Sequence, residues 1–152
     1  MSAARSLKIH HLLEASRANG PGVRAVVWTQ GCSLGCPGCF NPQTHPAQAG
    51  RRVGIAALTR SLLALAPSIE GVTISGGEPF QQAPALAELT SSLRAASSLS
   101  LIVFSGYSLA ELQRIPAAAA VLGSIDLLIA GRYEQSRRIA ARLLGSANKT
   151  LH

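Results

Sequence analysis

VRAVVWTQGCSLGCPGC (residues 23–39) joins an apolar segment to a loop that holds all three cysteines of the chain. Three further apolar segments, at residues 72–75, 101–104 and 125–129, are likewise short, rich in Val, Ile or Leu, and not strictly alternating. Continuous apolar strands of this kind are typical of a parallel sheet covered on both faces. Residues 7–15 predict one more strand, at the edge of the sheet.

Helical patterns separate these strands. Leu and Ile recur at helical spacing over residues 55–65 and again over residues 86–96, and Ser108 with Glu111 forms a capping-box pattern ahead of a short helix. Alternating strands and helices predict an α/β fold with right-handed crossovers. Because the chain has 152 residues, no repeat and no linker rich in Pro, Gly or Ser, we expect one domain over residues 1–152.

Each predicted strand runs into a short segment of glycine and small polar residues. Parallel strands would bring these segments to one rim of the sheet, where open sheets and barrels bind their ligands. This rim is therefore the predicted functional site, whereas Trp28, inside the first strand, is expected in the core. The four segments are Gln30-Gly31-Cys32, Gly76-Gly77-Glu78-Pro79, Ser105-Gly106-Tyr107 and Gly131-Arg132-Tyr133.

The composition is basic, with 14 Lys and Arg against 7 Asp and Glu and a formal charge of +7. The arginines are mostly scattered and no basic helix is interleaved with aromatics, so the pattern favours a solvated face or a dock for an acidic protein segment over a nucleic-acid partner. No apolar segment reaches the roughly 20 residues that cross a bilayer. The first 20 residues lack the apolar block of a secretory signal, so we expect a cytoplasmic protein with no membrane partner.

The cysteines follow the spacing Cys32-x3-Cys36-x2-Cys39. An odd number so close together is a poor disulfide framework and indicates metal or redox chemistry. Three thiolates on one tight loop can each bind one iron of a cubane cluster, which leaves the fourth iron open to a substrate. The alternatives are a structural zinc site with His45 as fourth ligand, and unligated cysteines, which a loop rich in Gly and Pro buries poorly.

Two of these segments resemble motifs of a known superfamily. CSLGCPGC (residues 32–39) matches the C-x3-C-x2-C signature of the radical S-adenosylmethionine superfamily, and VTISGGEP (residues 72–79) matches its Gly-Gly-Glu-Pro motif. NGPGVR (residues 19–24) and IDLLIAGRY (residues 125–133) are similar to segments of the glycyl-radical activating enzymes, above all of the anaerobic ribonucleotide reductase activating proteins.

The resemblance implies a fold, two cofactors and their ligands. The fold would be a partial (β/α) barrel of the radical S-adenosylmethionine type, with parallel strands and outer helices. A [4Fe-4S] cluster would be held by Cys32, Cys36 and Cys39, and S-adenosylmethionine would chelate its unique iron through amino and carboxylate groups. The methionine amino group would meet Gly76, Gly77 and Glu78, and the nucleoside would lie near Gly38, Phe40, Ser105 and Gly106.

The implied reaction is an oxidoreduction with no catalytic residue beyond the cluster. S-adenosylmethionine is cleaved by one electron to methionine and a 5′-deoxyadenosyl radical, which takes hydrogen from a backbone glycine of a large glycyl-radical enzyme such as anaerobic ribonucleoside-triphosphate reductase. A flavodoxin- or ferredoxin-type protein would donate the electron. Two alternatives stay open: a radical enzyme acting on a small molecule (deazaguanine type) or a ribosomal peptide, and a non-catalytic metal-binding docking module.

The sequence departs from the family pattern at three places. Gly38 stands where many superfamily members carry an aromatic residue. Val103 and Ala130 stand where pyruvate formate-lyase activators carry acids, which argues against a cation site there. The final segment GSANKTLH (residues 145–152) resembles the run-in to one more strand, so either the chain is truncated or the family's last segment is missing.

Overall fold

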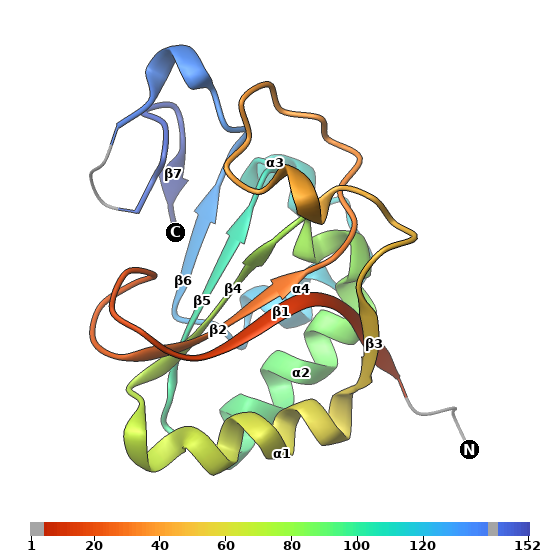
Figure 1. Cartoon of the computed structure of the whole chain (residues 1–152), viewed down its shortest axis with the longest axis vertical. Helices are drawn as coiled ribbons and strands as arrows, with labels where there is room; N and C mark the ends of the chain where they lie inside the picture. The colour runs from red at the N-terminus through yellow and green to blue at the C-terminus, as the bar shows by residue number, and fades with distance from the viewer. Residues whose placement is uncertain (1–4, 140–142) are drawn as a thin grey trace.

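The computed structural model describes residues 5–139 and 143–152, which form one mixed sheet of seven strands in the order β3-β1-β2-β4-β5-β6-β7 (Figure 1). The central strands β2, β4, β5 and β6 are parallel. Antiparallel strands flank them, with β1 beside β2, β3 beside β1 and β7 beside β6. The strands are β1 (Ser6–Ser16), β2 (Arg24–Thr29), β3 (Arg51–Gly54), β4 (Gly71–Gly76), β5 (Ser100–Ser105), β6 (Leu127–Ala130) and β7 (Thr150–Leu151).

Helices cover one face of this sheet, where α2 lies between α1 and α4 (Figure 1). The four α-helices are α1 (Ile55–Leu65), α2 (Ala83–Ala96), α3 (Leu109–Leu112) and α4 (Ala118–Leu122). The 3₁₀ turns are η1 (Pro42–Thr44), η2 (Ala66–Ser68), η3 (Pro79–Gln82) and η4 (Gln135–Arg137). No helix within the described residues is long and apolar enough to cross a membrane.

The predicted α/β class and the four parallel strands are confirmed, as is the capping box, in which Ser108 and Glu111 each bond to the other's backbone. The partial (β/α) barrel is not confirmed, because the antiparallel strands make the sheet mixed. The predicted edge strand β1 lies inside the sheet, since β3 pairs along its outer side. The sequence of β3, RRVG, is short and carries two charges, so it gives no strand pattern.

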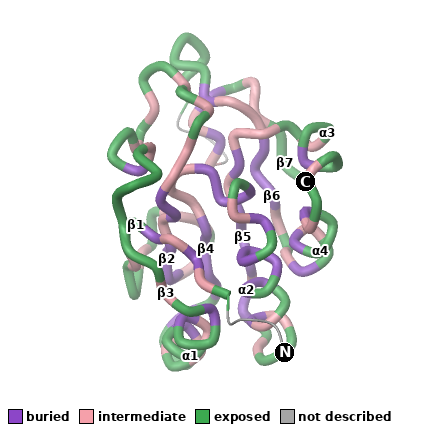
Figure 2. Tube along the Cα trace, turned by 90° about the vertical axis from the view of Figure 1, so that its right-hand side faces the viewer, coloured by how far each residue is buried: buried purple, intermediate pink, exposed green. Residues whose placement is uncertain are grey.

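The sheet separates two apolar cores, because neighbouring residues on a strand point to opposite faces. On β5, Leu101 and Val103 belong to the large core that includes the apolar sides of α1, α2 and α4. Ile102 and Phe104 instead join a small cluster with Leu144 on the other face. Figure 2 shows buried residues along β4, β5 and β6, with exposed ones in the outer loops. The second face therefore remains available for a binding site near the strand ends.

The NGPGVR segment is fixed to this second face by a fully buried arginine. All five guanidinium N–H donors of Arg24 are used: Nε donates to Thr73 Oγ1, Nη1 to the Pro21 carbonyl and Ser100 Oγ, and Nη2 to the Val72 and Ser100 carbonyls. Thr73 Oγ1 in turn donates to the Asn19 carbonyl at 2.7 Å. The buried network therefore sets the position of Asn19.

Candidate metal and cofactor site

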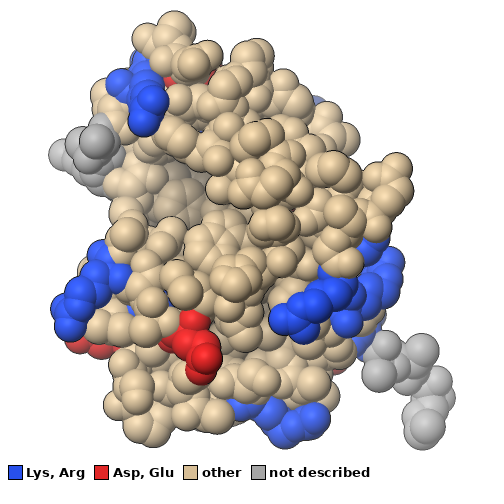
Figure 3. Space-filling view, in the orientation of Figure 1, with Lys and Arg blue, Asp and Glu red and all other residues tan. Residues whose placement is uncertain are grey.

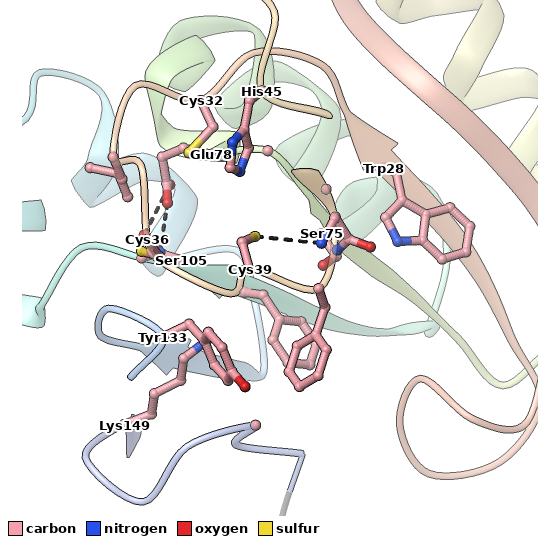
Figure 4. A pocket seen from close by; sticks show the side chains of 18 of the residues that line it. Trp28, Cys32, Cys36, Cys39, His45, Ser75, Glu78, Ser105, Tyr133 and Lys149 are labelled. Atoms are coloured by element: carbon pink, nitrogen blue, oxygen red, sulfur yellow. Dashed lines mark hydrogen bonds between the residues drawn. The ribbon is translucent and has the colours of Figure 1, made fainter. Parts of the chain in front are cut away.

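A pocket of about 340 Å³ lies at the carboxyl ends of β2, β4 and β5. Figure 3 shows a hollow near the centre of this face, walled mostly by uncharged side chains. All three cysteines line the pocket, together with both predicted glycines of β4's end (Figure 4). The lining is Asn19, Trp28, Cys32, Leu34, Cys36, Cys39, Phe40, Asn41, His45, Ser75, Gly76, Gly77, Glu78, Phe104, Ser105, Gly106, Tyr133, Leu143, Leu144, Gly145 and Lys149.

Nine of the ten residues that the sequence nominated line this pocket; the exception is Gly38. Gly38 is exposed, has φ +71°, and a Cβ there would lie 2.6 Å from the side chain of Gln135. A larger residue would therefore displace Gln135 as well as strain the backbone. The structure accordingly gives Gly38 a role in the turn between Cys36 and Cys39, outside the pocket wall.

The cysteine loop, defined here as residues 30–50, is held mainly by its own backbone. The amide of Gly31 donates to the Thr44 carbonyl at 2.7 Å, and the amide of Cys32 donates to the His45 carbonyl at 3.1 Å. The buried Gln30 side chain donates to two further carbonyls of the loop. These bonds close the loop into a ring that presents its cysteines on one side.

The cysteines are free thiols and half-buried. Burial raises the pKa of the Cys32 thiol, and the nearby Glu78 and the other two cysteines act in the same direction, while a backbone N–H of Leu34 opposes the shift. The amide of Asn41 donates to Cys39 Sγ at 3.4 Å. A bound metal would favour the thiolate forms, and an amide directed at sulfur is one of the features that tune iron–sulfur clusters.

The donor set is three free thiols around one pocket. In a cubane each thiolate binds a different iron at the cluster's surface, so three separate thiols suit a cubane. Across residues 5–139 and 143–152, no group of three or more His, Cys, Asp or Glu side chains lies together as ligands of a single ion.

Glu78 is buried, with 1% of its surface exposed, and forms no salt bridge with any described residue. Its carboxylate accepts hydrogen bonds from the Gly106 amide at 2.6 Å, Ser105 Oγ at 2.9 Å and the Phe80 amide at 3.0 Å (Figure 4). Burial raises the pKa of Glu78 to about 7, although these hydrogen bonds act to lower it. The side chain ties the end of β4 to the end of β5.

The glycine–glutamate turn, residues 76–78, packs backbone to backbone against the start of the cysteine loop. Gly77 N donates to the Thr29 carbonyl at 2.9 Å, and Glu78 N donates to the Gly31 carbonyl at 3.0 Å. A Cβ on Gly77 would lie 2.4 Å from the Gly31 carbonyl oxygen. Glycine is thus required because two backbones meet here, and the two sequence motifs contact each other directly.

A second carboxylate, that of Glu111, lies outside the pocket wall and pairs with Arg132. Arg132 pairs with Glu111, with Nη1–Oε1 at 3.0 Å and Nη2–Oε2 at 3.1 Å, and its guanidinium carbon lies 5.3 Å from the centroid of the Tyr107 ring. Arg132 Nη1 also donates to the Gly106 carbonyl. The pair therefore fixes the backbone of Gly106 from the solvent side, while Glu78 binds its amide from within.

Sequence reasoning placed Trp28 in the core, and this was wrong. Trp28 is half-buried, stacks on His11 with ring centroids 5.8 Å apart, and lines the pocket. On β2 it alternates with Val27, which faces the large core. Strand periodicity places the two residues on opposite faces, but in an apolar strand it does not say which face is the core. Tyr133, from the fourth predicted rim segment, does line the pocket. Sequence reasoning missed the pocket residues Asn19 and Lys149, which only the tertiary fold brings to the rim.

Phe40 is 54% exposed and forms the outer lip of the pocket. Its ring lies 4.7 Å from that of the buried Tyr133, and the guanidinium carbon of Arg138 lies 5.1 Å from the Phe40 ring centroid. Two aromatic rings in contact at the mouth can shield one side of a bound planar group from water.

Comparisons with known proteins agree with this site. A family described as "4Fe-4S single cluster domain" matches residues 18–152. The chain is 28% identical over 153 residues to the anaerobic ribonucleoside-triphosphate reductase-activating protein of Escherichia coli K12, covering 96% of this chain and 98% of that protein. It is 37% identical over 92 residues to the pyruvate formate-lyase-activating enzyme of Staphylococcus epidermidis, covering 57% of this chain but 37% of that enzyme.

A solved structure shares the fold. QueE from Escherichia coli superposes with a TM-score of 0.51 at 17% sequence identity, over 68% of this chain and 52% of that one. At this identity the likeness concerns the arrangement of strands and helices alone.

Proposed function

The chain belongs to the family of 4Fe-4S single cluster domains, and from that premise we propose that it is a radical enzyme whose [4Fe-4S] cluster is held by Cys32, Cys36 and Cys39 and whose pocket binds S-adenosylmethionine. One observation supports the proposal above the others: three free thiols and the glycine-rich ends of β4 and β5 line the same pocket. A cluster bound by these three thiolates would keep one iron without a protein ligand.

The chain's own residues would bind the cofactors, orient them and shield them from water. When bound, the cluster and S-adenosylmethionine together supply the one-electron cleavage that yields methionine and a 5′-deoxyadenosyl radical. We propose that Gly76, Gly77 and Glu78 bind the methionine amino group, since a buried carboxylate is a strong acceptor for an ammonium. Phe40, Ser105 and Gly106 would contact the nucleoside, and Gly38 would act through the turn it forms.

The proposed substrate is a backbone glycine of a larger protein. Hydrogen transfer from the glycine Cα to the 5′ carbon would give 5′-deoxyadenosine and a glycyl radical. The one electron that the cleavage of S-adenosylmethionine consumes would come from a flavodoxin- or ferredoxin-type donor. The match over nearly the full length of the Escherichia coli activating protein supports anaerobic ribonucleoside-triphosphate reductase as the partner. We further propose that the sheet forms part of a (β/α) barrel whose open side the partner covers.

The test uses anaerobically reconstituted protein with dithionite, S-adenosylmethionine and a purified anaerobic reductase. We expect 5′-deoxyadenosine by chromatography and a glycyl radical signal by electron paramagnetic resonance, with Cys36→Ala as the inactive control. 5′-Deoxyadenosine without a glycyl radical would keep the radical chemistry and reject this partner. The docking-module alternative predicts neither product.

A further inference from the structure

Lys149 reaches the pocket from the segment that enters β7. Pairing of Ala130 with Thr150 sets β7 beside β6 and so places Lys149 next to Gly131. A Cβ on Gly131 would lie 3.4 Å from Lys149 Cα and 3.5 Å from its Cγ, in ordinary van der Waals contact, so the lysine stem runs directly beside the end of β6. Figure 4 shows the side chain rising past Tyr133 toward the cavity.

Neighbouring side chains hold this segment firmly in place. Ser146 is fully buried and accepts a hydrogen bond from the Glu134 amide at 3.1 Å. The side-chain amide of Asn148 donates to the Arg132 carbonyl at 2.8 Å. Lys149 is therefore presented to the pocket by a fixed backbone and not by a free chain end.

Lys149 differs from Arg132, another cation at this rim. Arg132 is neutralised by two hydrogen bonds to Glu111. Lys149 makes no salt bridge in the described part of the chain, and no hydrogen bond of its ammonium is found there. Desolvation lowers the pKa of Lys149, whereas the negative forms of Cys36, Cys39 and Glu78 act to raise it. The acidic groups nearest to Lys149 are thus ones that line the same pocket.

We propose that Lys149 is the counter-cation of the cluster site, where its ammonium offsets the negative charge of the cysteine-bound cluster and makes the cluster easier to reduce. The inference rests on the proposed function, because it needs a cluster on Cys32, Cys36 and Cys39. Net charge and nearby groups set the reduction potential of such clusters. A positive charge in a partly desolvated pocket favours the added electron more strongly than one at the surface.

The experiment is a redox titration of the reconstituted protein without S-adenosylmethionine or partner, followed by visible absorbance and electron paramagnetic resonance. The variants are Lys149→Met, which removes the charge and keeps the length, and Lys149→Arg, which keeps the charge. Arg60→Met removes one exposed charge on α1, at the far end of the molecule, and is the matched control (Figure 1). Iron and sulfide per chain and the melting temperature of the metal-free protein are measured for each.

At the wild-type midpoint potential we expect the reduced-to-oxidised ratio of Lys149→Met to fall about tenfold, which is about 59 mV for a one-electron couple. Lys149→Arg and Arg60→Met should stay near wild type. The metal-free Met variant should melt no lower than wild type, because a half-buried ammonium with no salt bridge among the described residues does not stabilise the fold. A stable Met variant that retains less iron and sulfide would also support the counter-cation role.

Other outcomes overturn the inference. An unchanged potential in Lys149→Met, with wild type cleaving S-adenosylmethionine, rejects Lys149 and leaves the proposed function standing. A metal-free Met variant that melts well below wild type assigns the lysine to structure alone. Wild-type protein that takes up no iron and sulfide rejects the proposed function and this inference together.

Discussion

The cysteine loop and the glycine–glutamate turn lie side by side at the rim, yet they are built differently. In the turn, Glu78 is buried and accepts three hydrogen bonds, and Gly77 has no room for a side chain. In the loop the thiols are half-buried, and a Cβ on Gly35 would meet nothing within 4 Å. The turn belongs to the packed structure of the protein, whereas the loop keeps its three thiols outside it.

The largest expected effect comes from the same substitution made in both regions. Gly77→Ala should cost about 3 kcal/mol of unfolding free energy, because the Gly31 carbonyl 2.4 Å away is backbone and cannot move cheaply. Gly35→Ala, at φ +63° in open space, should cost about 1 kcal/mol from the left-handed conformation alone. Urea unfolding of the metal-free proteins measures both. Equal losses of unfolding free energy in the two variants would contradict the inferred difference in packing between the turn and the loop.

A pH dependence should follow from the buried Glu78. Burial raises the pKa of Glu78 to about 7 in the folded protein, against the ordinary value of 4.5 for a glutamate carboxyl. A carboxyl with a raised folded pKa binds its proton more tightly in the folded state, so the stability it contributes is present below pH 4.5 and is lost as pH rises through 7. The loss is on the order of 3 kcal/mol.

Urea unfolding of the metal-free protein at several pH values between 4.5 and 8 measures this loss. Glu78→Gln cannot titrate, so its unfolding free energy should fall less over that interval than that of wild type, whatever its starting stability. Parallel curves for the two proteins would mean that Glu78 ionises normally and that the turn is not closed to water.

The smallest expected effect on stability is that of Cys36→Ala in the cysteine loop. Because Cys36 is half-buried on the rim and outside both apolar cores, the metal-free variant should unfold within about 0.5 kcal/mol of wild type. The same variant should fail to assemble the cluster. Wild-type levels of iron and sulfide would contradict the ligand assignment, and a large loss of stability would place the loop inside the packed structure.

Local patterns predicted the central part of the fold. The apolar segments at 72–75 and 101–104 lie within β4 and β5, and the helical spacing over 55–65 coincides with α1, because buried strands and amphipathic helices bear their own periodicity. The predicted kinship with the glycyl-radical activating enzymes is also confirmed by similar proteins. The assignments of the individual cofactor contacts stay predictions; they concern Gly38, Phe40, Gly76, Gly77, Glu78, Ser105 and Gly106.

Most of the features that the sequence did not predict depend on pairing between strands that lie far apart in the chain. The strand β3 is too short and too charged to show a pattern, and it forms because β1 offers a free edge. Lys149 reaches the pocket only because β7 pairs with β6, and no motif marks it. Trp28 shows the remaining failure, since an apolar strand does not reveal which of its residues faces the helices and which faces the pocket.

The ring of backbone bonds that closes the cysteine loop, from Gly31 to Thr44 and from Cys32 to His45, uses no cysteine side chain. The thiols of Cys32, Cys36 and Cys39 are therefore left free for a ligand, and exchange of that ligand at the sulfurs would break neither of these two bonds. On the proposed function, a damaged cluster could then be rebuilt on the same loop.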